Sequence, residues 1–303
     1  MKARLFSKSL QGEGLLVLIR LRITPESNSI LPPFTSRTLK SIAGNANCLK
    51  PVWNLYSSRK RFKPVTFRVL TTDRFRPLYK RVNGEDSDVI TVRKDYTYYG
   101  FITFYARSLA DVPVAECDEQ VSIEYGRFHV AMDSMDMRML DFLGRDEYER
   151  VKISIRTPLT ITTKIMSPPV KTGSRLARLL DSTREAYRLL PTPGFIAAQA
   201  ARQWLGIVKT LEPKGHILPY AIGRLSDIMI AEIDYHLRPI TVLYGKDEAG
   251  RKRLVRGVTG FIVLEPVNDS IRFAFSRLLD FASILGLGKS RSIGFGELTV
   301  EYK

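Results

Sequence analysis

The sequence predicts an α+β fold. Strand-like and helix-like segments follow the order β-α-β-β near the N-terminus and β-β-α-β at the C-terminus. The apolar fraction of 44% is normal for a globular protein and excludes wholesale disorder. With 303 residues, the chain is long enough for one large domain or for two domains of ordinary size.

The N-terminal unit is predicted from one strand, one helix and several further strands. Residues 14–24 form an apolar run interrupted by two arginines, which is typical of a half-buried strand. A short helix over 36–44 follows, with Thr35 or Ser36 as its cap and Gly44 at its end. Further strand-like segments lie at 65–72, 96–107, 121–125 and 127–132. This order fits the start of a ferredoxin-like unit.

The second unit opens with a β-rich run at 151–165. Helical periodicity covers 174–190 and 195–211, and another apolar stretch runs over 218–233. Two strands, at 238–245 and 253–266, are joined by a hairpin tip that contains Gly250.

A well-formed last helix precedes the final strand. Asn268 or Asp269 caps this helix, and Gly286 is a natural residue for its C-terminal end. The last strand runs over 293–302, so a glycine-rich loop joins the last helix to the last strand.

The composition points to a soluble protein with a polyanionic partner. The apolar runs are too short to span a bilayer, the N-terminus does not resemble a signal peptide, and Cys48 and Cys117 indicate neither a zinc site nor a disulfide framework. We therefore expect a cytoplasmic location.

The net charge is +16, and the stretch from Arg37 to Arg81 holds twelve basic residues against one acid, Asp73. A heat-adapted surface would mix both signs, so this stretch favours nucleic-acid binding.

The glycine-rich loop reads GLGKSRSIGFG over 286–296. Phosphate-binding loops of nucleotide sites precede their helix, whereas this loop follows one, where the helix dipole is negative. A nucleoside-triphosphate site is therefore disfavoured. The glycines either let the backbone approach an RNA phosphate chain or serve a tight turn, and we favour binding.

The pattern G-x-G-x5-G-x-G resembles the C-terminal loop of the repeat-associated RNA-binding (RAMP) superfamily of CRISPR systems. More narrowly, it resembles the endoribonuclease that cuts precursor CRISPR RNA within its repeats, as do the segments 16–44, 152–162 and 257–266. The resemblance implies two tandem ferredoxin-like (RRM-like) domains. We expect them at 1–147, with the first helix and a basic loop, and at 148–303, with a helical insertion and the glycine-rich loop.

The resemblance also implies the chemistry: metal-independent cleavage by the ribose 2′-hydroxyl, which leaves a 2′,3′-cyclic phosphate, with no cofactor and no metal. Many members of the family carry a catalytic histidine on or just after the first helix, but residues 30–65 contain none here. The candidate catalytic residues are therefore Lys40, Tyr56, Lys60 and His216. The other two histidines, His129 and His236, lie in strand-like segments that favour a structural role.

RNA-binding candidates come from the basic region after the first helix, the hairpin tip and the glycine-rich loop. They are Arg37, Lys50, Arg59, Arg61, Lys63, Arg251, Lys252, Arg253, Arg256, Gly286, Gly288, Lys289, Ser290, Arg291, Gly294 and Gly296. The rings of Tyr96, Tyr98, Tyr99 and Phe101 could stack on bases. Adjacent Tyr98 and Tyr99 face opposite sides of a strand, which favours packing between sheet and helices instead.

Two alternatives to an endoribonuclease stay open at this point. One is a non-catalytic RNA-binding subunit of a CRISPR effector complex, which the missing histidine favours. The other is a single-strand RNA-binding protein unrelated to CRISPR. The expected partners are CRISPR repeat RNA and other CRISPR effector subunits, with no membrane contact, and the protein is expected to be a monomer or a homodimer.

Overall fold

The first strand, β1 (Leu15–Pro25), is the centre of a five-stranded antiparallel sheet. It pairs with β5 (Tyr98–Ala106) on one side and with β7 (Gly126–Met139) on the other. Strands β3 (Val65–Phe67) and β6 (Asp118–Ile123) form the two edges, so the order is β3-β5-β1-β7-β6. In the computed structural model, the described residues are 4–58, 60–82, 89–94, 96–112, 116–170, 173–211, 217–246 and 249–303.

Two short helices cover one face of this sheet. Helices α1 (Ser36–Asn45) and α2 (Lys50–Ser57) contribute Leu39 and Val52 to a core shared with β1, β3 and β5. A small sheet of β2 (Ser29–Leu31) and β4 (Ile90–Val92), and two 3-10 turns, η1 (Leu109–Asp111) and η2 (Leu140–Phe142), complete the unit. Without β6, the strand order is that of a ferredoxin-like sheet, and η1 and β6 stand where its second helix would be.

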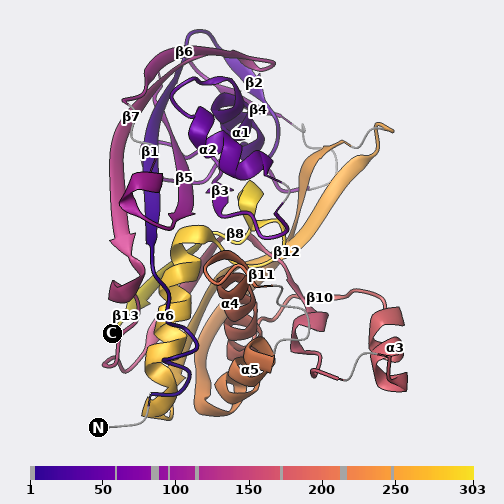
Figure 1. Ribbon diagram of the computed structural model, residues 1–303. Coiled ribbons are helices and arrows are strands. Elements are labelled where there is room, and N and C mark those ends of the chain that lie inside the picture. The colour runs from indigo at the N-terminus through magenta and orange to yellow at the C-terminus, as the bar shows by residue number, and fades with distance from the viewer. Residues whose placement is uncertain are drawn as a thin grey trace.

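The C-terminal unit has the complete ferredoxin-like order. Its sheet runs β11 (Ile230–Lys246), β12 (Lys252–Pro266), β8 (Val151–Leu159) and β13 (Leu298–Tyr302). Figure 1 shows this unit below the first, with the β11–β12 hairpin reaching up beside it. Helices α4 (Pro193–Ile207), α5 (Ile217–Met229) and α6 (Asp269–Leu285) accompany this sheet. The predicted α+β fold of two ferredoxin-like domains is confirmed.

The ends of α6 match the sequence expectation. The side chain of Asn268 accepts a hydrogen bond from the Ser270 amide at the start of the helix, and Gly286 follows its end with φ 78°. Thr35 occupies the N-cap position of α1, as expected, but its hydroxyl donates to the Leu78 carbonyl and makes no capping hydrogen bond to a helix amide.

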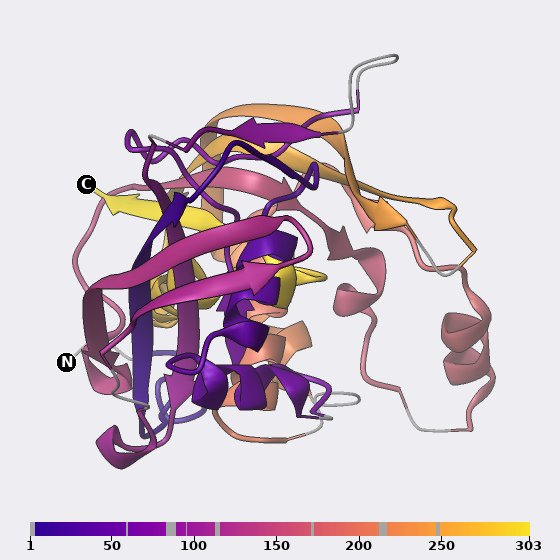
Figure 2. The ribbon, with the colours of Figure 1, turned by 90° about the horizontal axis from the view of Figure 1, so that it is seen from above.

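The predicted helix over 174–190 is wrong beyond residue 182. Helix α3 (Arg175–Ser182) has no buried residue to extend its packing. Strand β10 (Tyr187–Arg188) follows and pairs with β9 (Ile161–Thr162), next to the turn η3 (Thr163–Met166). Pairing with β9 thus replaces the last two predicted helical turns. Figure 2 shows α3 at the side of the molecule.

The glycine-rich loop lies at the junction of the two units. It includes the 3-10 turn η4 (Arg291–Ile293), and its four glycines have φ between 64° and 92°. Gly294 faces the Phe67 carbonyl and the Ser36 side chain so closely that a Cβ atom there would collide with them. The loop amides of Leu287, Lys289 and Gly296 bond to protein carbonyls. Gly294 is therefore required for packing between the units, whereas Gly286, Gly288 and Gly296 allow close packing within the second unit.

Arg291 is the buried centre of this junction, with only 5% of its surface exposed. Its guanidinium donates to the Thr66 hydroxyl at 2.9 Å and the Leu285 carbonyl at 3.1 Å, and also to the Lys63 carbonyl. Two of these acceptors belong to the first unit. Burial lowers the pKa of Arg291 to about 10.

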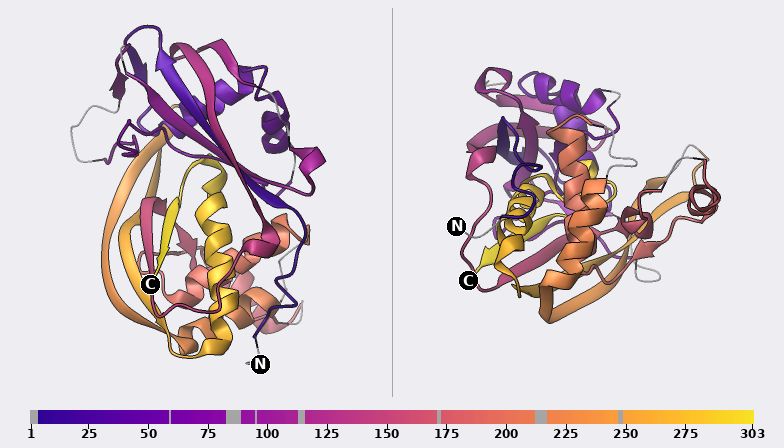
Figure 3. Two further views of the ribbon diagram at one scale, coloured as in Figure 1. Left: turned by 90° about the vertical axis from the view of Figure 1, so that its left-hand side faces the viewer. Right: turned by 60° about the horizontal axis from the view of Figure 1, so that its bottom comes forward.

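Further contacts extend the junction on both sides. The rings of Phe34 and Phe295 stack with centroids 4.3 Å apart, and the Ser36 hydroxyl donates to the Ile293 carbonyl. Near the N-terminus, Leu10 belongs to the core of the second unit. Figure 3 shows this N-terminal segment beside α6. The last strand of the first sheet ends at Met139, and the first strand of the second sheet begins at Val151. The exact domain boundary after residue 147 stays a prediction.

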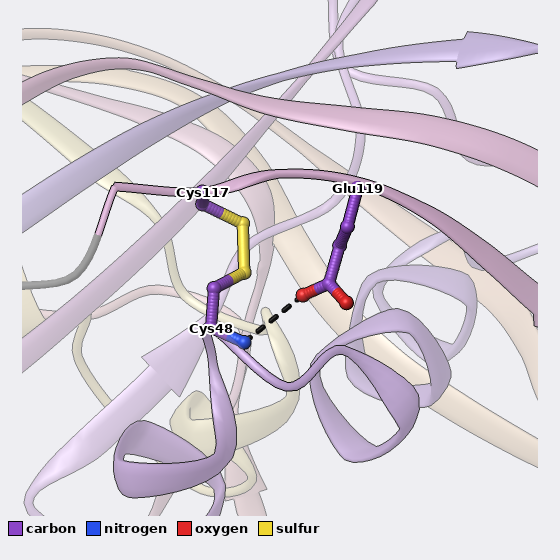
Figure 4. A group of neighbouring side chains, drawn as sticks. All are labelled: Cys48, Cys117 and Glu119. Carbon is purple, nitrogen blue, oxygen red and sulfur yellow. Dashed lines mark hydrogen bonds between the residues drawn. A yellow bond between two sulfur atoms is a disulfide. The ribbon is translucent and has the colours of Figure 1, made fainter.

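The structure corrects one further expectation, because Cys48 and Cys117 are joined by a disulfide. The loop between α1 and α2 lies next to the residues that lead into β6, which brings the two cysteines together across 69 positions of sequence. Figure 4 shows Glu119 beside them, accepting a hydrogen bond from the Cys48 amide at 2.9 Å. Within the described residues, this group is also the one arrangement with metal-ligand spacing, but both sulfurs are held in the disulfide.

Replacement of Arg291 by alanine is expected to lower the free energy of unfolding by about 2–4 kcal/mol, because buried acceptors lose their donor. Thermal or denaturant unfolding measures the loss. Lys289→Ala is the matched control two residues away, since its side chain is half exposed and the change should cost less than about 1 kcal/mol. Equal losses for the two variants would contradict a structural role for Arg291.

Candidate functional site

A polar pocket of about 340 Å³ lies between the two units. Helices α1 and α2 supply one wall, and β11 of the second unit supplies the other. The lining residues are Arg37, Lys40, Ser41, Gly44, Asn45, Trp53 and Tyr244. Two of them are cationic and none is acidic, so the pocket suits a phosphate group.

Lys40 is held over aromatic rings. Its ammonium nitrogen lies 4.8 Å from the centre of the Tyr56 ring and 6.0 Å from that of Trp53. Lys63 reaches the Tyr56 ring from another direction, at 5.6 Å. Tyr56 itself is fixed by an edge contact with Phe67, 5.3 Å between ring centres. Lys40 of α1 and Lys63 of the loop before β3 thus lie around one half-buried phenol ring.

Arg37 of α1 lies against the β11 side of the pocket, where Tyr244 is. The Arg37 guanidinium packs against Gly245, where any side chain would collide with it. Burial, together with the nearby phenol of Tyr56, raises the pKa of Tyr244 to about 12, although Arg37 and Arg253 act in the opposite direction. Tyr244 is therefore protonated at neutral pH and can donate a hydrogen bond to a bound anion.

The structure brings together only part of the candidate catalytic set. Lys40 and Tyr56 are in contact, whereas Lys60 is an exposed residue after the end of α2. Two candidates, His216 and Arg59, lie outside the described residues. Lys50 is exposed at the start of α2.

The two strand histidines occupy packed or paired positions, as expected. The imidazole of His129 pairs with the Asp118 carboxylate at 2.6 Å. His236 accepts a hydrogen bond from Arg238 at 2.8 Å and stacks on Phe261.

Only the tip of the glycine-rich loop is exposed. Lys289 and Ser290 face solvent, whereas the four glycines and Arg291 are buried. The Lys289 ammonium pairs with the Glu185 carboxylate at 3.0 Å and contacts the Tyr187 hydroxyl. Hydrogen bonding from Lys289 lowers the pKa of Glu185. Of the loop residues expected to bind RNA, only those at the tip are therefore accessible. Arg291 is not accessible to a ligand in this conformation.

A second cavity, of about 660 Å³, lies beside α3. Arg61 from the first unit and the basic residues Lys164, Arg178 and Arg202 of the second unit contribute to its lining, together with Asp181 and Glu185. Its mixed charge suits a phosphate less well than the first pocket does.

The β11–β12 hairpin carries exposed cations at its tip and, at Arg256, further along β12. Arg251, Lys252, Arg253 and Arg256 are all exposed, and Arg253 pairs with Gly245 in the strand register. Because Arg253 lies close enough to Tyr244 to influence its pKa, the hairpin continues the positive charge of the pocket outward.

The sequence did not indicate Tyr244 or Trp53. Tyr244 belongs to a long strand with ordinary alternation, and nothing in its surroundings in the sequence marks it. A weak signal existed in Gly245, since a glycine inside a strand often marks a close approach of another group. That group is Arg37.

The two units match two domain models of one family. Residues 17–137 match the Cas6 N-terminal domain, and residues 153–298 match the CRISPR-associated endoribonuclease Cas6. Each of the described helices is too short or too polar to cross a membrane.

Individual proteins agree with these models. The CRISPR-associated endoribonucleases Cas6 1 and Cas6 2 of Saccharolobus solfataricus are each 26% identical to this chain, over 95% of it and 97% of theirs. A Cas6 product complex has a TM-score of 0.54 at 16% identity, over 95% of this chain and 100% of that one. Thermus thermophilus Cas6 has a TM-score of 0.52 at 14% identity, over 96% and 100%. The chain belongs to the Cas6 family of CRISPR-associated endoribonucleases.

Proposed function

We propose that this protein cuts precursor CRISPR RNA within its repeats, at the pocket between α1, α2 and β11. The observation that carries the proposal is the placement of Lys40 and Arg37 around a pocket lined without carboxylates. Carboxylates are the ligands that Mg²⁺ prefers, so the lining suits a reaction in which protein cations stabilise the charge.

The proposed reaction is an in-line attack by a ribose 2′-oxygen on the adjacent phosphorus. The bond from phosphorus to the 5′-oxygen breaks, the 2′-proton is lost, and the 5′-oxygen gains a proton. The products are a 2′,3′-cyclic phosphate and a free 5′-hydroxyl. The enzyme must hold the three reacting atoms in line and stabilise the extra negative charge on the phosphate.

The pocket residues divide these tasks. Lys40 and Arg37 lie where they can contact the non-bridging oxygens of a phosphate in the pocket. Tyr56 holds the Lys40 ammonium in place through its ring. Tyr244 is protonated at neutral pH, as an ordinary tyrosine is, and can donate to the phosphate or to the leaving oxygen. His216 and Lys60 stay candidates for proton transfer and phosphate contact.

The remaining cations extend the RNA path beyond the pocket. The exposed hairpin residues, together with Lys50, Arg61 and the loop tip, are proposed to contact phosphates. Other CRISPR effector subunits stay proposed partners.

Incubation of the purified protein with labelled repeat RNA in EDTA is expected to give cleavage at one position. The 5′ fragment should end in a cyclic phosphate, and a 2′-deoxy substitution at that position should block the reaction. Tight binding without cleavage would favour the non-catalytic effector subunit instead. No preference for repeat RNA over an unrelated RNA would leave a general RNA-binding protein.

Lys40→Ala is expected to slow single-turnover cleavage by about 10²-fold or more, since a cation near the transition-state charge is lost. Tyr244→Phe keeps the ring and removes the donor, so a smaller loss of about 10-fold is expected. Lys8→Ala, a change at an exposed lysine away from the pocket, is the control. Wild-type rates for Lys40→Ala would reject the assigned pocket.

His216→Ala in the same assay tests acid–base catalysis, for which a loss of about 10²-fold is expected.

Removal of hairpin charge is expected to weaken RNA binding most at low salt. The double variant Arg251→Gln and Arg256→Gln should lower the slope of log affinity against log salt by about 0.7–0.9 for each lost phosphate contact. Binding titrations between low and high salt measure this slope, with Lys94→Gln as the control at another exposed lysine. An unchanged slope would show that the hairpin does not contact phosphates.

A further inference from the structure

A partly exposed group of aromatic rings lies on the face of the N-terminal sheet opposite α1 and α2. Tyr98 packs into the helix-covered core, whereas its neighbour Tyr99 lies on the opposite face. The register places Tyr99 beside Arg22 and Phe101 beside Arg20 across the strand pair β1–β5. The open face of this sheet therefore alternates rings with arginines.

A turn from outside the sheet adds a third ring. Phe75 lies 5.5 Å from Tyr99 and 6.1 Å from Phe101 between ring centres, and 41% of its surface is exposed. Tyr99 and Phe101 are half-buried beneath it, so Phe75 is the exposed ring of this cluster. Large apolar side chains are usually buried, which makes the partly exposed cluster a candidate contact surface.

The backbone holds Phe75 in this exposed position. Its φ of 53° lies in the left-handed region, which is rare for a bulky residue. Hydrogen bonds fix the turn, since the Phe75 amide donates to the Thr72 carbonyl and the Thr72 amide to the Arg76 carbonyl. Arg156 of the second unit also donates to the Phe75 carbonyl. Backbone strain of this kind is concentrated at functional sites.

Positive charge surrounds the rings. Arg20 lies 6.0 Å from the centre of the Tyr99 ring, and 55% of the Arg22 side chain is exposed. Both arginines contact the Asp133 carboxylate, and a second acid, the exposed Asp73, lies in the turn of Phe75. Arg74 and Arg76, on either side of Phe75, are exposed.

We propose that Phe75, Tyr99 and Phe101 form a stacking platform for unpaired bases of single-stranded RNA, separate from the pocket at Lys40. Rings on an open antiparallel sheet stack on bases, and arginines beside them neutralise the phosphates between those bases. The platform rests on the proposed function only in taking RNA as the ligand. Because the sheet separates it from α1 and α2, it binds a part of the RNA away from the cut.

The test compares single-stranded decaadenylate with an abasic decamer that has the same backbone. Fluorescence anisotropy measures both affinities for the wild type and for Phe75→Leu and Tyr99→Leu. Each variant keeps an apolar side chain but loses the ring, so decaadenylate should bind about 10-fold more weakly, while binding of the abasic decamer should not change. Phe142→Leu, at an exposed ring elsewhere, is the control and should bind both probes like the wild type. Thermal unfolding shows whether each variant is folded, and Phe75→Trp should restore binding.

Wild-type affinity of Phe75→Leu and Tyr99→Leu for decaadenylate would overturn the platform, as would an equal loss for both probes. The proposed function and the platform can be told apart. If the wild type leaves repeat RNA uncut while loss of the ring still weakens decaadenylate binding, the proposed function is wrong and the platform stands. If both proposals hold, Phe75→Leu raises the RNA concentration needed for half-maximal cleavage, whereas Lys40→Ala lowers the rate at saturating RNA.

Discussion

The buried guanidinium of Arg291 is the interaction on which the arrangement of the two units depends. It joins the end of α6 to the start of β3 through hydrogen bonds on both sides. A buried cation can be kept only where its donors are satisfied, and here neutral oxygens of both units satisfy them. Gly294, three residues away, allows the loop to approach the first unit this closely. The relative position of α1 and β11, and with it the pocket, follows from this junction.

Elements with strong local signals could be predicted from the sequence. Helix α6 has apolar periodicity and a side-chain cap at Asn268, and both are found in the structure. The predicted end of helix α3 was wrong. An amphipathic pattern shows only that a helix is possible, while tertiary contacts decide how long it is. The pairing of β10 with β9 and the disulfide between Cys48 and Cys117 are both contacts between distant segments, which local patterns do not contain.

In the candidate site too, residues with a local sequence signal could be predicted, whereas residues placed by contacts between distant segments could not. Lys40, Arg37 and Tyr56 could be selected because they lie within a basic stretch near the first helix. Tyr244 could not, because it reaches the pocket only through the packing of the second unit against the first. Arg291 illustrates the opposite error: a basic residue among glycines is typical of a binding loop, yet burial gives it a structural task. Sequence position alone does not separate a cation that meets a ligand from one that meets carbonyl groups.

The β11–β12 hairpin carries Tyr244 at the pocket and arginines near its tip on one continuous ribbon. A paired ribbon has a nearly fixed rise of about 3.3 Å per residue. If the proposed function holds, the hairpin backbone sets a distance along the RNA. This distance separates the phosphates bound at the tip from the phosphate that is cut. Lengthening or shortening the ribbon by a pair of residues would then move the cleavage position along the repeat without any change to the reacting groups.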